Sequence, residues 1–322
     1  DQGQALTRRH INRLSRLGVG HLFIRDPALE DLDPFIVDED LQQAENRLTR
    51  ELSEIRNDLQ TGANLSISVK RLQNALEKLT EAITETEALM GFTSLKSHND
   101  YTAKHSVDVA KLSVHLLLSN RAKLREKLRD ESGASRTYTN KYMLEDLGLG
   151  ALLHDLGKWK LPQEILEKSS SLDEREWEAV KTHPKAGHDL IEDQKRDFRA
   201  PVKTPALQHH EQFGGGGYPK GIGGENIHLY GRIAALADVY SALTSTRPYR
   251  VEKTPNRARQ IMNQMQEDHE HFDPELFEMF KEAVPPFPVG QQVILSNGSR
   301  GVVAEVPDQP DQPTVRILQE GT

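Results

Sequence analysis

The 322-residue sequence contains no cysteine. It can form no disulfide, and any metal ion that it binds must be held by histidine and carboxylate side chains. Basic residues are outnumbered, 41 against 49 acidic ones, and the net charge of −8 argues against a broad DNA- or RNA-binding surface. No stretch is long and apolar enough to cross a membrane, and no signal peptide is visible. We therefore expect a cytoplasmic protein without membrane insertion.

Charged residues and helical periodicity dominate what is present. The length suits one large domain with one or two small ones. We expect a mainly α fold in four parts. These are an N-terminal helix and strand segment (1–37), a long helical hairpin (38–94), a helical domain (95–285) and a small antiparallel β unit in the tail (286–322).

The first 94 residues predict short elements followed by two long helices. A helix is expected from Leu6 to Gly18, and a strand from His21 to Ile24. Apolar residues at helical spacing then predict amphipathic helices over 38–62 and 66–90. Such a hairpin packs either within the chain or across a homodimer, and a packing layer for the next domain is the preferred interpretation.

Residues 95–285 read as almost entirely helical, and the remaining tail changes character. Segment 121–141 predicts a loop with a short helix, and the glycines at 214–217 predict a loop. Asn297-Gly298 predicts a β-hairpin in the tail, whose sheet could pair with the strand at 21–24. Helices are expected over 105–118, 144–154, from Asp173 with a capping box to Glu176, over 232–244 and over 255–267.

Two polar pairs and one isolated aspartate stand out in these helices. His154-Asp155 ends an apolar run, and Asp238 lies among apolar residues. Burying such groups without a partner costs several kcal/mol, and a metal ion is the simplest partner. His209-His210 poses a further problem, because consecutive helical residues diverge by about 100°. Both can face one centre only at a helix end or with two metals.

Together these residues predict a centre with two metal ions. With His105 and His183 included, five histidines and two aspartates exceed the needs of one site. Asp155 is the natural bridge, and such a site activates water and clamps a phosphoryl oxygen. Lys158 lies one turn beyond and could reach that oxygen, although a solvent-exposed lysine is the alternative. The other histidines considered, assigned to surface or core, are His115, His188, His228, His269 and His271.

These motifs resemble the HD-GYP subgroup of the HD-domain phosphohydrolases over residues 95–285. The matching segments are His154-Asp155-Leu156-Gly157-Lys158, His183-Pro184, His209-His210-Glu211, Gly217-Tyr218-Pro219, Ala237-Asp238-Val239-Tyr240 and Thr244-Ser245-Thr246-Arg247-Pro248-Tyr249-Arg250. The resemblance implies an HD-domain helical bundle and a bacterial phosphodiesterase that hydrolyses cyclic di-GMP to pGpG and, in many members, onward to GMP.

The resemblance also implies roles for individual residues. Two divalent ions are expected, Fe or Mn first, with Ni, Mg or Zn as alternatives. Lys158 and Asp155 would be catalytic, and Lys158, Tyr218, Arg247 and Arg250 would contact substrate, with surface charge as the alternative for the arginines. The metal ligands would be His105, His154, Asp155, His183, His209, His210 and Asp238.

The sequence departs from the family's usual motifs at several positions. Gln212, Gly214 and Gly216 replace an arginine, an aspartate and a serine, and Ser241 stands where a second aspartate is common. Tyr101 occupies the position of a glutamate that holds a third metal in some members, which favours a dinuclear site.

Two alternatives to this enzyme stay open at this stage. A catalytically weak cyclic-dinucleotide sensor would bind its ligand and signal through the N-terminal helices, an idea motivated by Gly214 and Ser241. The intact set of ligands argues against it. The second alternative is a phosphohydrolase that acts on a different cyclic dinucleotide.

Overall fold

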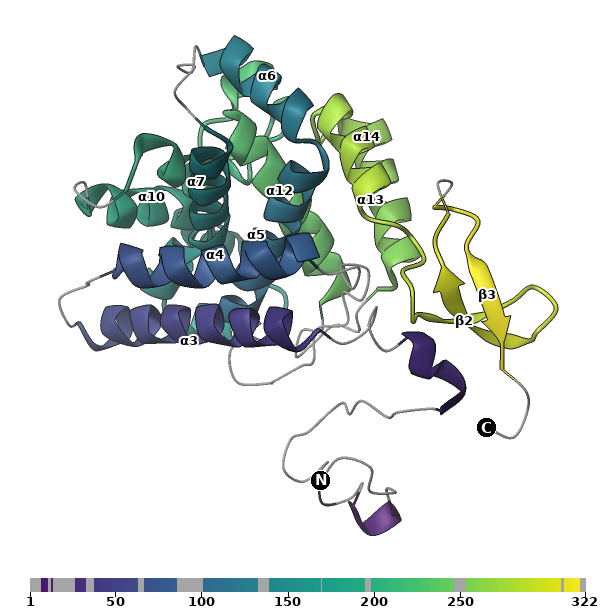
Figure 1. Ribbon diagram of the computed structural model, residues 1–322. Helices are drawn as coiled ribbons and strands as arrows, with labels where there is room; N and C mark the ends of the chain where they lie inside the picture. The colour runs from purple at the N-terminus through teal and green to yellow at the C-terminus, as the bar shows by residue number, and fades with distance from the viewer. Residues whose placement is uncertain are drawn as a thin grey trace.

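Two long antiparallel helices form a layer along one side of a helical bundle, and a small sheet lies beside it (Figure 1). The structure is a computed structural model. It describes residues 7–10, 13, 27–32, 38–62, 67–85, 101–132, 139–168, 170–194, 198–245, 253–307 and 310–318.

The elements follow one another as helices until the last three, which are strands. The longer helices are α3 (Glu39–Thr61), α4 (Val69–Glu85), α5 (Tyr101–Ser119), α6 (Arg121–Ser132), α7 (Asn140–Leu152), α10 (His183–Asp193), α12 (Leu229–Thr244), α13 (Pro255–His269) and α14 (Pro274–Ala283). The short ones are η1 (Pro27–Leu32), η3 (Leu156–Lys160), α8 (Gln163–Leu166), α9 (Glu174–Val180), η4 (Ala200–Lys203), α11 (Thr204–Gln208) and η5 (Gly224–Asn226). The strands are β1 (Gln292–Ile294), β2 (Arg300–Glu305) and β3 (Thr314–Ile317).

The helical hairpin of α3 and α4 packs within the chain. Asp38 caps α3 by accepting a 2.8 Å hydrogen bond from the Leu41 amide, and Gly62 ends it in the left-handed region at φ 70°. The buried leucines of both helices, such as Leu52 and Leu72, belong to the same core as those of α5 and α7. The packing layer predicted from the sequence is therefore present. A homodimer through these helices stays a prediction.

Helices α5, α7 and α12 form the centre of the bundle and are buried on most sides. Buried residues lie on most sides of these helices, which is typical of helices with little solvent-facing surface. Helix α5 packs against both α7 and α12. Polar groups on these three helices therefore lie deep in the protein, where they need partners.

Two helices differ from the sequence-based expectation. Helix α6 occupies Arg121–Ser132, so the short helix expected within 121–141 is present but longer than predicted. Its apolar signal is small, because only Leu124 and Leu128 reach the core. Helix α14 was not expected. Asp273 caps it and Pro274 follows at its first position, an order of residues that marks a helix start.

The C-terminal tail forms the antiparallel sheet that was predicted, with the strand order β1-β2-β3. Gly298 turns the first hairpin at φ 84°. The 3-10 helix η1 packs on this sheet through Leu32, and Arg316 donates two hydrogen bonds, of 2.7 and 2.6 Å, to Asp31. The predicted strand at 21–24 and most of the helix at 6–18 lie outside the described residues.

The predicted divisions of the chain at residues 37, 94 and 285 stay predictions, although one continuous core joins the hairpin to the bundle. Across the part of the chain that the structure describes, no helix is both long and apolar enough to cross a membrane.

The shared core predicts that the hairpin and the bundle unfold together. Leu52→Ala should lower the free energy of unfolding by about 3 kcal/mol, because it leaves a cavity in a fully buried layer. Urea denaturation followed by circular dichroism measures this, with the exposed Gln43→Ala on the same helix as control. A separate early transition of the hairpin in the variant would contradict the shared core.

Candidate metal centre

Histidine and aspartate side chains gather inside the bundle in two adjacent groups. In each group the nitrogen and oxygen atoms that could bind a metal lie within 4.8 Å of one another. Neither group includes the five histidines assigned to surface or core, and His115, for example, donates to the Ala283 carbonyl instead. The groups comprise Asp155, His183, His209 and His210, and His105, His154 and Asp238, which are the seven ligands proposed from the sequence.

Helix ends bring most of these side chains together. His154 and Asp155 lie in the turn between α7 and η3, and His183 is the first residue of α10. Helix α11 ends at Gln208, so His209 and His210 follow its last turn. The two rings lie 4.0 Å apart between centroids. The helix end anticipated from the sequence thus allows consecutive histidines to face one region.

Close backbone packing at Gly157 holds two of these turns against each other. A Cβ atom at Gly157 would lie 2.0 Å from the His183 carbonyl oxygen and 2.5 Å from the Gly187 nitrogen. Any side chain there would push η3 away from the start of α10. The glycine in the His154–Lys158 motif therefore sets the distance between Asp155 and His183.

Backbone carbonyls orient three of the imidazole rings. A carbonyl oxygen can only accept, so each Nδ1 must carry the proton and each Nε2 presents its lone pair to the interior. This arrangement is typical of metal-binding histidines. The bonds run from His154 to Ala151 (2.7 Å), from His183 to Val180 (2.7 Å) and from His209 to Pro205 (2.8 Å).

Burial keeps most of the rings neutral and their lone pairs free. It lowers the pKa of His209 to about 4 and also lowers the pKa values of His183 and His210. Burial opposes charge on His154 as well, but the Asp155 carboxylate beside it raises the pKa of that ring. Burial likewise disfavours a charged Asp155, yet His154 and Lys158 hold its pKa well below the usual range.

The two oxygens of Asp155 face different groups. Oδ1 lies 3.3 Å from His183 Nε2 and 3.6 Å from His209 Nε2. Oδ2 lies 3.4 Å from His154 Nε2 and 3.9 Å from His105 Nε2. The carboxylate, with only 1% of its residue surface exposed, therefore stands between the two sets of nitrogen atoms.

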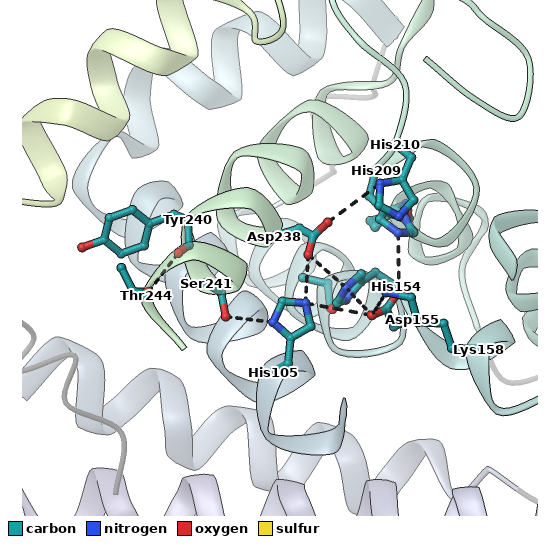
Figure 2. A network of polar contacts seen from close by, with 12 residues as sticks. His105, His154, Asp155, Lys158, His209, His210, Asp238, Tyr240, Ser241 and Thr244 are labelled. Carbon is teal, nitrogen blue, oxygen red and sulfur yellow. Dashed lines mark hydrogen bonds and ion pairs between the residues drawn. The ribbon is translucent and has the colours of Figure 1, made fainter. Parts of the chain in front are cut away.

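Helix α12 holds His105 from two sides (Figure 2). Asp238 Oδ1 lies 2.8 Å from His105 Nε2, and Ser241 Oγ lies 2.9 Å from His105 Nδ1. Burial disfavours the charged form of Asp238, but the hydrogen bond from His105 keeps its pKa well below the usual range. In the other tautomer, Nδ1 carries the proton and donates a hydrogen bond to the Ser241 hydroxyl, so that Nε2 no longer donates to Asp238 and is free for a metal ion. Ser241 thus fills, with a shorter side chain, the position where an aspartate is common.

Several buried atoms of the site lack partners that protein groups can supply. Within the described residues, His154 Nε2 and Asp155 Oδ1 are buried and make no hydrogen bond. His183 Nε2 and His209 Nε2 lie 3.3 Å apart, and both are acceptors when Nδ1 is protonated. Leaving such groups unpaired costs about 1–3 kcal/mol each. Divalent cations bound by the two groups would satisfy these atoms, so the donor set fits such ions.

Lys158 and Tyr218 border the histidine cluster, as the sequence suggested. Lys158 Nζ donates a 2.6 Å hydrogen bond to Asp155 Oδ2, and a quarter of its side chain stays exposed. The Tyr218 ring stacks on His210, with centroids 4.6 Å apart. Burial raises the pKa of Tyr218, so its hydroxyl stays protonated. Arg247 and Arg250 lie outside the described residues.

Glu211, whose role was not predicted, organises the loop that carries Tyr218. Its buried carboxylate accepts hydrogen bonds from the backbone amides of Lys220 (2.7 Å) and Ile222 (3.1 Å). These contacts fold residues 212–222 back towards the histidines. The position of Glu211 directly after His209-His210 is the only sequence signal for this role.

Gly214 and Gly216, which depart from the family's usual motif, fit the packing of this loop. Gly214 donates to the Glu270 carbonyl at 2.8 Å, and a Cβ atom on it would lie 2.7 Å from the His269 carbonyl oxygen. Gly216 has φ 83°, which favours glycine over serine. The loop thus packs directly on the connection between α13 and α14.

The comparisons with known proteins agree with this geometry. The family profile described as "HD domain" matches residues 105–276, just over half of the chain. The chain belongs to the HD-domain family. Matches to proteins named as cyclic di-GMP phosphodiesterases support the more specific HD-GYP assignment that the motifs predicted.

Curated relatives of this HD-domain protein carry two kinds of name. One is "Cyclic di-GMP phosphodiesterase PA4108" from Pseudomonas aeruginosa, 37% identical over 68% of this chain and 48% of the relative. "Cyclic di-GMP phosphodiesterase response regulator RpfG" from Xanthomonas campestris is 42% identical over 34% of this chain and 29% of its own. "3'3'-cGAMP-specific phosphodiesterase 2" from Vibrio cholerae is 37% identical over 40% and 24%. Each match spans about half of the relative's length or less.

A solved structure shares the fold. Bd1817, an HDG"Y"P protein from Bdellovibrio bacteriovorus, matches with a TM-score of 0.55 over 84% of this chain and 78% of its own. The two are 18% identical, so the likeness concerns the fold alone.

The hydroxyl of Ser241 predicts a measurable effect on metal affinity. Ser241→Ala should weaken metal binding by about tenfold, because the partner that orients His105 is lost. Isothermal titration calorimetry with Mn²⁺ measures this. Ser113→Ala on α5 is the matched control, since its hydroxyl is buried without a hydrogen-bond partner among the described residues. Equal affinities of Ser241→Ala and the wild type would show that Ser241 does not orient the ring.

Proposed function

We propose that this protein is a metal-dependent phosphodiesterase that hydrolyses cyclic di-GMP to pGpG. The observation that carries the proposal is the position of Asp155, whose two oxygens face two separate sets of imidazole nitrogens. A carboxylate in that position suits a bridge between two cations. The names of the relatives supply the substrate class.

The centre would hold two divalent ions, Fe or Mn in preference to Ni, Mg or Zn. One would be bound by His183, His209 and His210, the other by His105, His154 and Asp238, with Asp155 shared. Bound there, the ions would lower the pKa of a water molecule and polarise a phosphoryl oxygen. The neutral imidazoles and ionised carboxylates suit this role without first losing protons, except at His154.

Lys158 and Tyr218 would act on the substrate. As the bond from phosphorus to the leaving 3′-oxygen breaks, negative charge develops on the phosphoryl oxygens, and the Lys158 ammonium would stabilise it. The protonated Tyr218 hydroxyl can donate a hydrogen bond to a phosphate or ribose oxygen. Arg247 and Arg250 keep their proposed role as phosphate contacts from the sequence.

A second substrate has specific support, because relatives from Vibrio cholerae are named as 3'3'-cGAMP-specific phosphodiesterases. Their alignments are about as similar as those of the proteins named for cyclic di-GMP. Both substrates present the same phosphodiester to the proposed centre and differ in one base. The cytoplasmic location and the homodimer remain parts of the proposal.

Turnover with and without metal tests the proposed activity. Protein loaded with Mn²⁺ or Fe²⁺ should convert cyclic di-GMP to pGpG, as measured by liquid chromatography, and chelation followed by gel filtration should abolish turnover. The panel includes 3'3'-cGAMP and cyclic di-AMP. Tight binding of cyclic di-GMP with no product from any member of the panel would contradict the enzymatic activity and support a cyclic-dinucleotide sensor.

The position of Lys158 beside Asp155 predicts that its replacement slows the chemical step. Lys158→Met should lower kcat by about 100-fold, because one charge-stabilising donor is removed from the reaction site. Lys160→Met, two residues further on the same short helix and exposed, should leave kcat within about twofold of the wild type. Similar kcat values for Lys158→Met and Lys160→Met would exclude Lys158 from the chemical step.

A further inference from the structure

An exposed tryptophan lies beside the candidate metal centre. Trp177, on α9, keeps 45% of its surface exposed, whereas Trp159 is buried with 6% exposed. A single exposed apolar residue needs no explanation by itself. Trp177 differs because its indole ring contacts Tyr218 edge to face, with centroids 6.3 Å apart and planes at 76°.

The ring of Tyr218 connects this tryptophan to the histidines. Tyr218 stacks on His210 at 4.6 Å and 28°, and its ring also meets His183 at 6.4 Å and 79°. Trp177, Tyr218 and His210 thus form a row of aromatic rings. The row runs from the protein surface to the group of residues around Asp155.

The backbone holds Trp177 in a fixed position. A capping box begins α9, with the Glu176 amide 2.9 Å from Asp173 Oδ1 and the Asp173 amide 2.7 Å from Glu176 Oε2. The Trp177 amide donates to the Asp173 carbonyl at 2.9 Å. Six residues later the chain reaches His183, the first residue of α10. The indole and this histidine are therefore carried by one continuous, well-anchored stretch.

We propose that the exposed indole of Trp177 is a stacking surface for one nucleobase of the cyclic dinucleotide. The inference rests on the proposed function, which places the phosphodiester among the histidines. A flat aromatic surface next to a phosphate site suits a nucleotide, because every base has a π face that can stack. Stacking depends little on base identity. Trp177 would therefore supply affinity for guanine and adenine alike, without selecting between them.

Steady-state kinetics with a matched set of variants tests this role. Trp177→Ala should raise KM about tenfold for cyclic di-GMP and by the same factor for 3'3'-cGAMP, with kcat within about threefold. Trp177→Phe should recover most of the loss, because a smaller ring still stacks. Ile294→Ala, which removes an exposed apolar side chain from β1, is the control and should leave KM unchanged. Metal content should be equal in all variants.

Fluorescence gives a second measurement that does not require turnover. The chain has two tryptophans, so Trp177 is the exposed emitter. A phosphorothioate analogue of cyclic di-GMP should quench wild-type emission, and Trp177→Phe should lose most of that quenching. Inorganic phosphate, which has no base, should quench neither protein.

The outcomes separate this inference from the proposed function. Normal turnover by the wild type, with unchanged KM in Trp177→Ala and no quenching, would overturn the stacking surface and leave the phosphodiesterase intact. If the wild type shows no turnover but its fluorescence quenching depends on Trp177, the proposed enzymatic activity would be overturned and the stacking role of Trp177 would stand. A change of oligomeric state in Trp177→Ala, with unchanged KM, would assign the tryptophan to a protein interface and contradict the inference.

Discussion

The carboxylate of Asp155 is the constraint on which the rest of the site depends. It is buried in the middle of a helical bundle, with its oxygens facing imidazole nitrogens from two directions. Charge in such a place is costly, and beyond the ion pair with Lys158 the surrounding nitrogens can offset that cost only if cations or protons lie between them and the carboxylate. The arrangement of Asp155 and the imidazole nitrogens inside the bundle therefore suits the binding of divalent ions.

The packing of short turns determines the geometry of the candidate metal site. Helix α7 ends just before His154, and Gly157 lets η3 approach the start of α10 without a side chain between them. Backbone carbonyls then fix three rings with their lone pairs inward. Rigid elements that hold each donor in one orientation are what a metal site requires. The Glu211 carboxylate likewise fixes the loop that carries Tyr218, by accepting hydrogen bonds from two of its backbone amides.

The sequence pointed to these residues because polar residues in apolar helices are conspicuous. His154-Asp155 and Asp238 stood out for that reason, and the structure brings them together with the other proposed ligands. Contacts that join distant residues could not be predicted from spacing. The bond between His105 and Ser241 spans 136 positions, and Gly214 meets a turn more than 50 residues later. Helix α6 is longer than the short helix expected, because only two of its residues reach the core. Helix α14 was missed although Asp273-Pro274 marks its start.

Element-specific anomalous diffraction from crystals loaded with Mn²⁺ tests the central claim most directly. The account predicts two peaks, one beside His183, His209 and His210, the other beside His105, His154 and Asp238, with Asp155 contacting both. One peak alone, or two peaks of which neither touches Asp155, would contradict a bridged dinuclear centre.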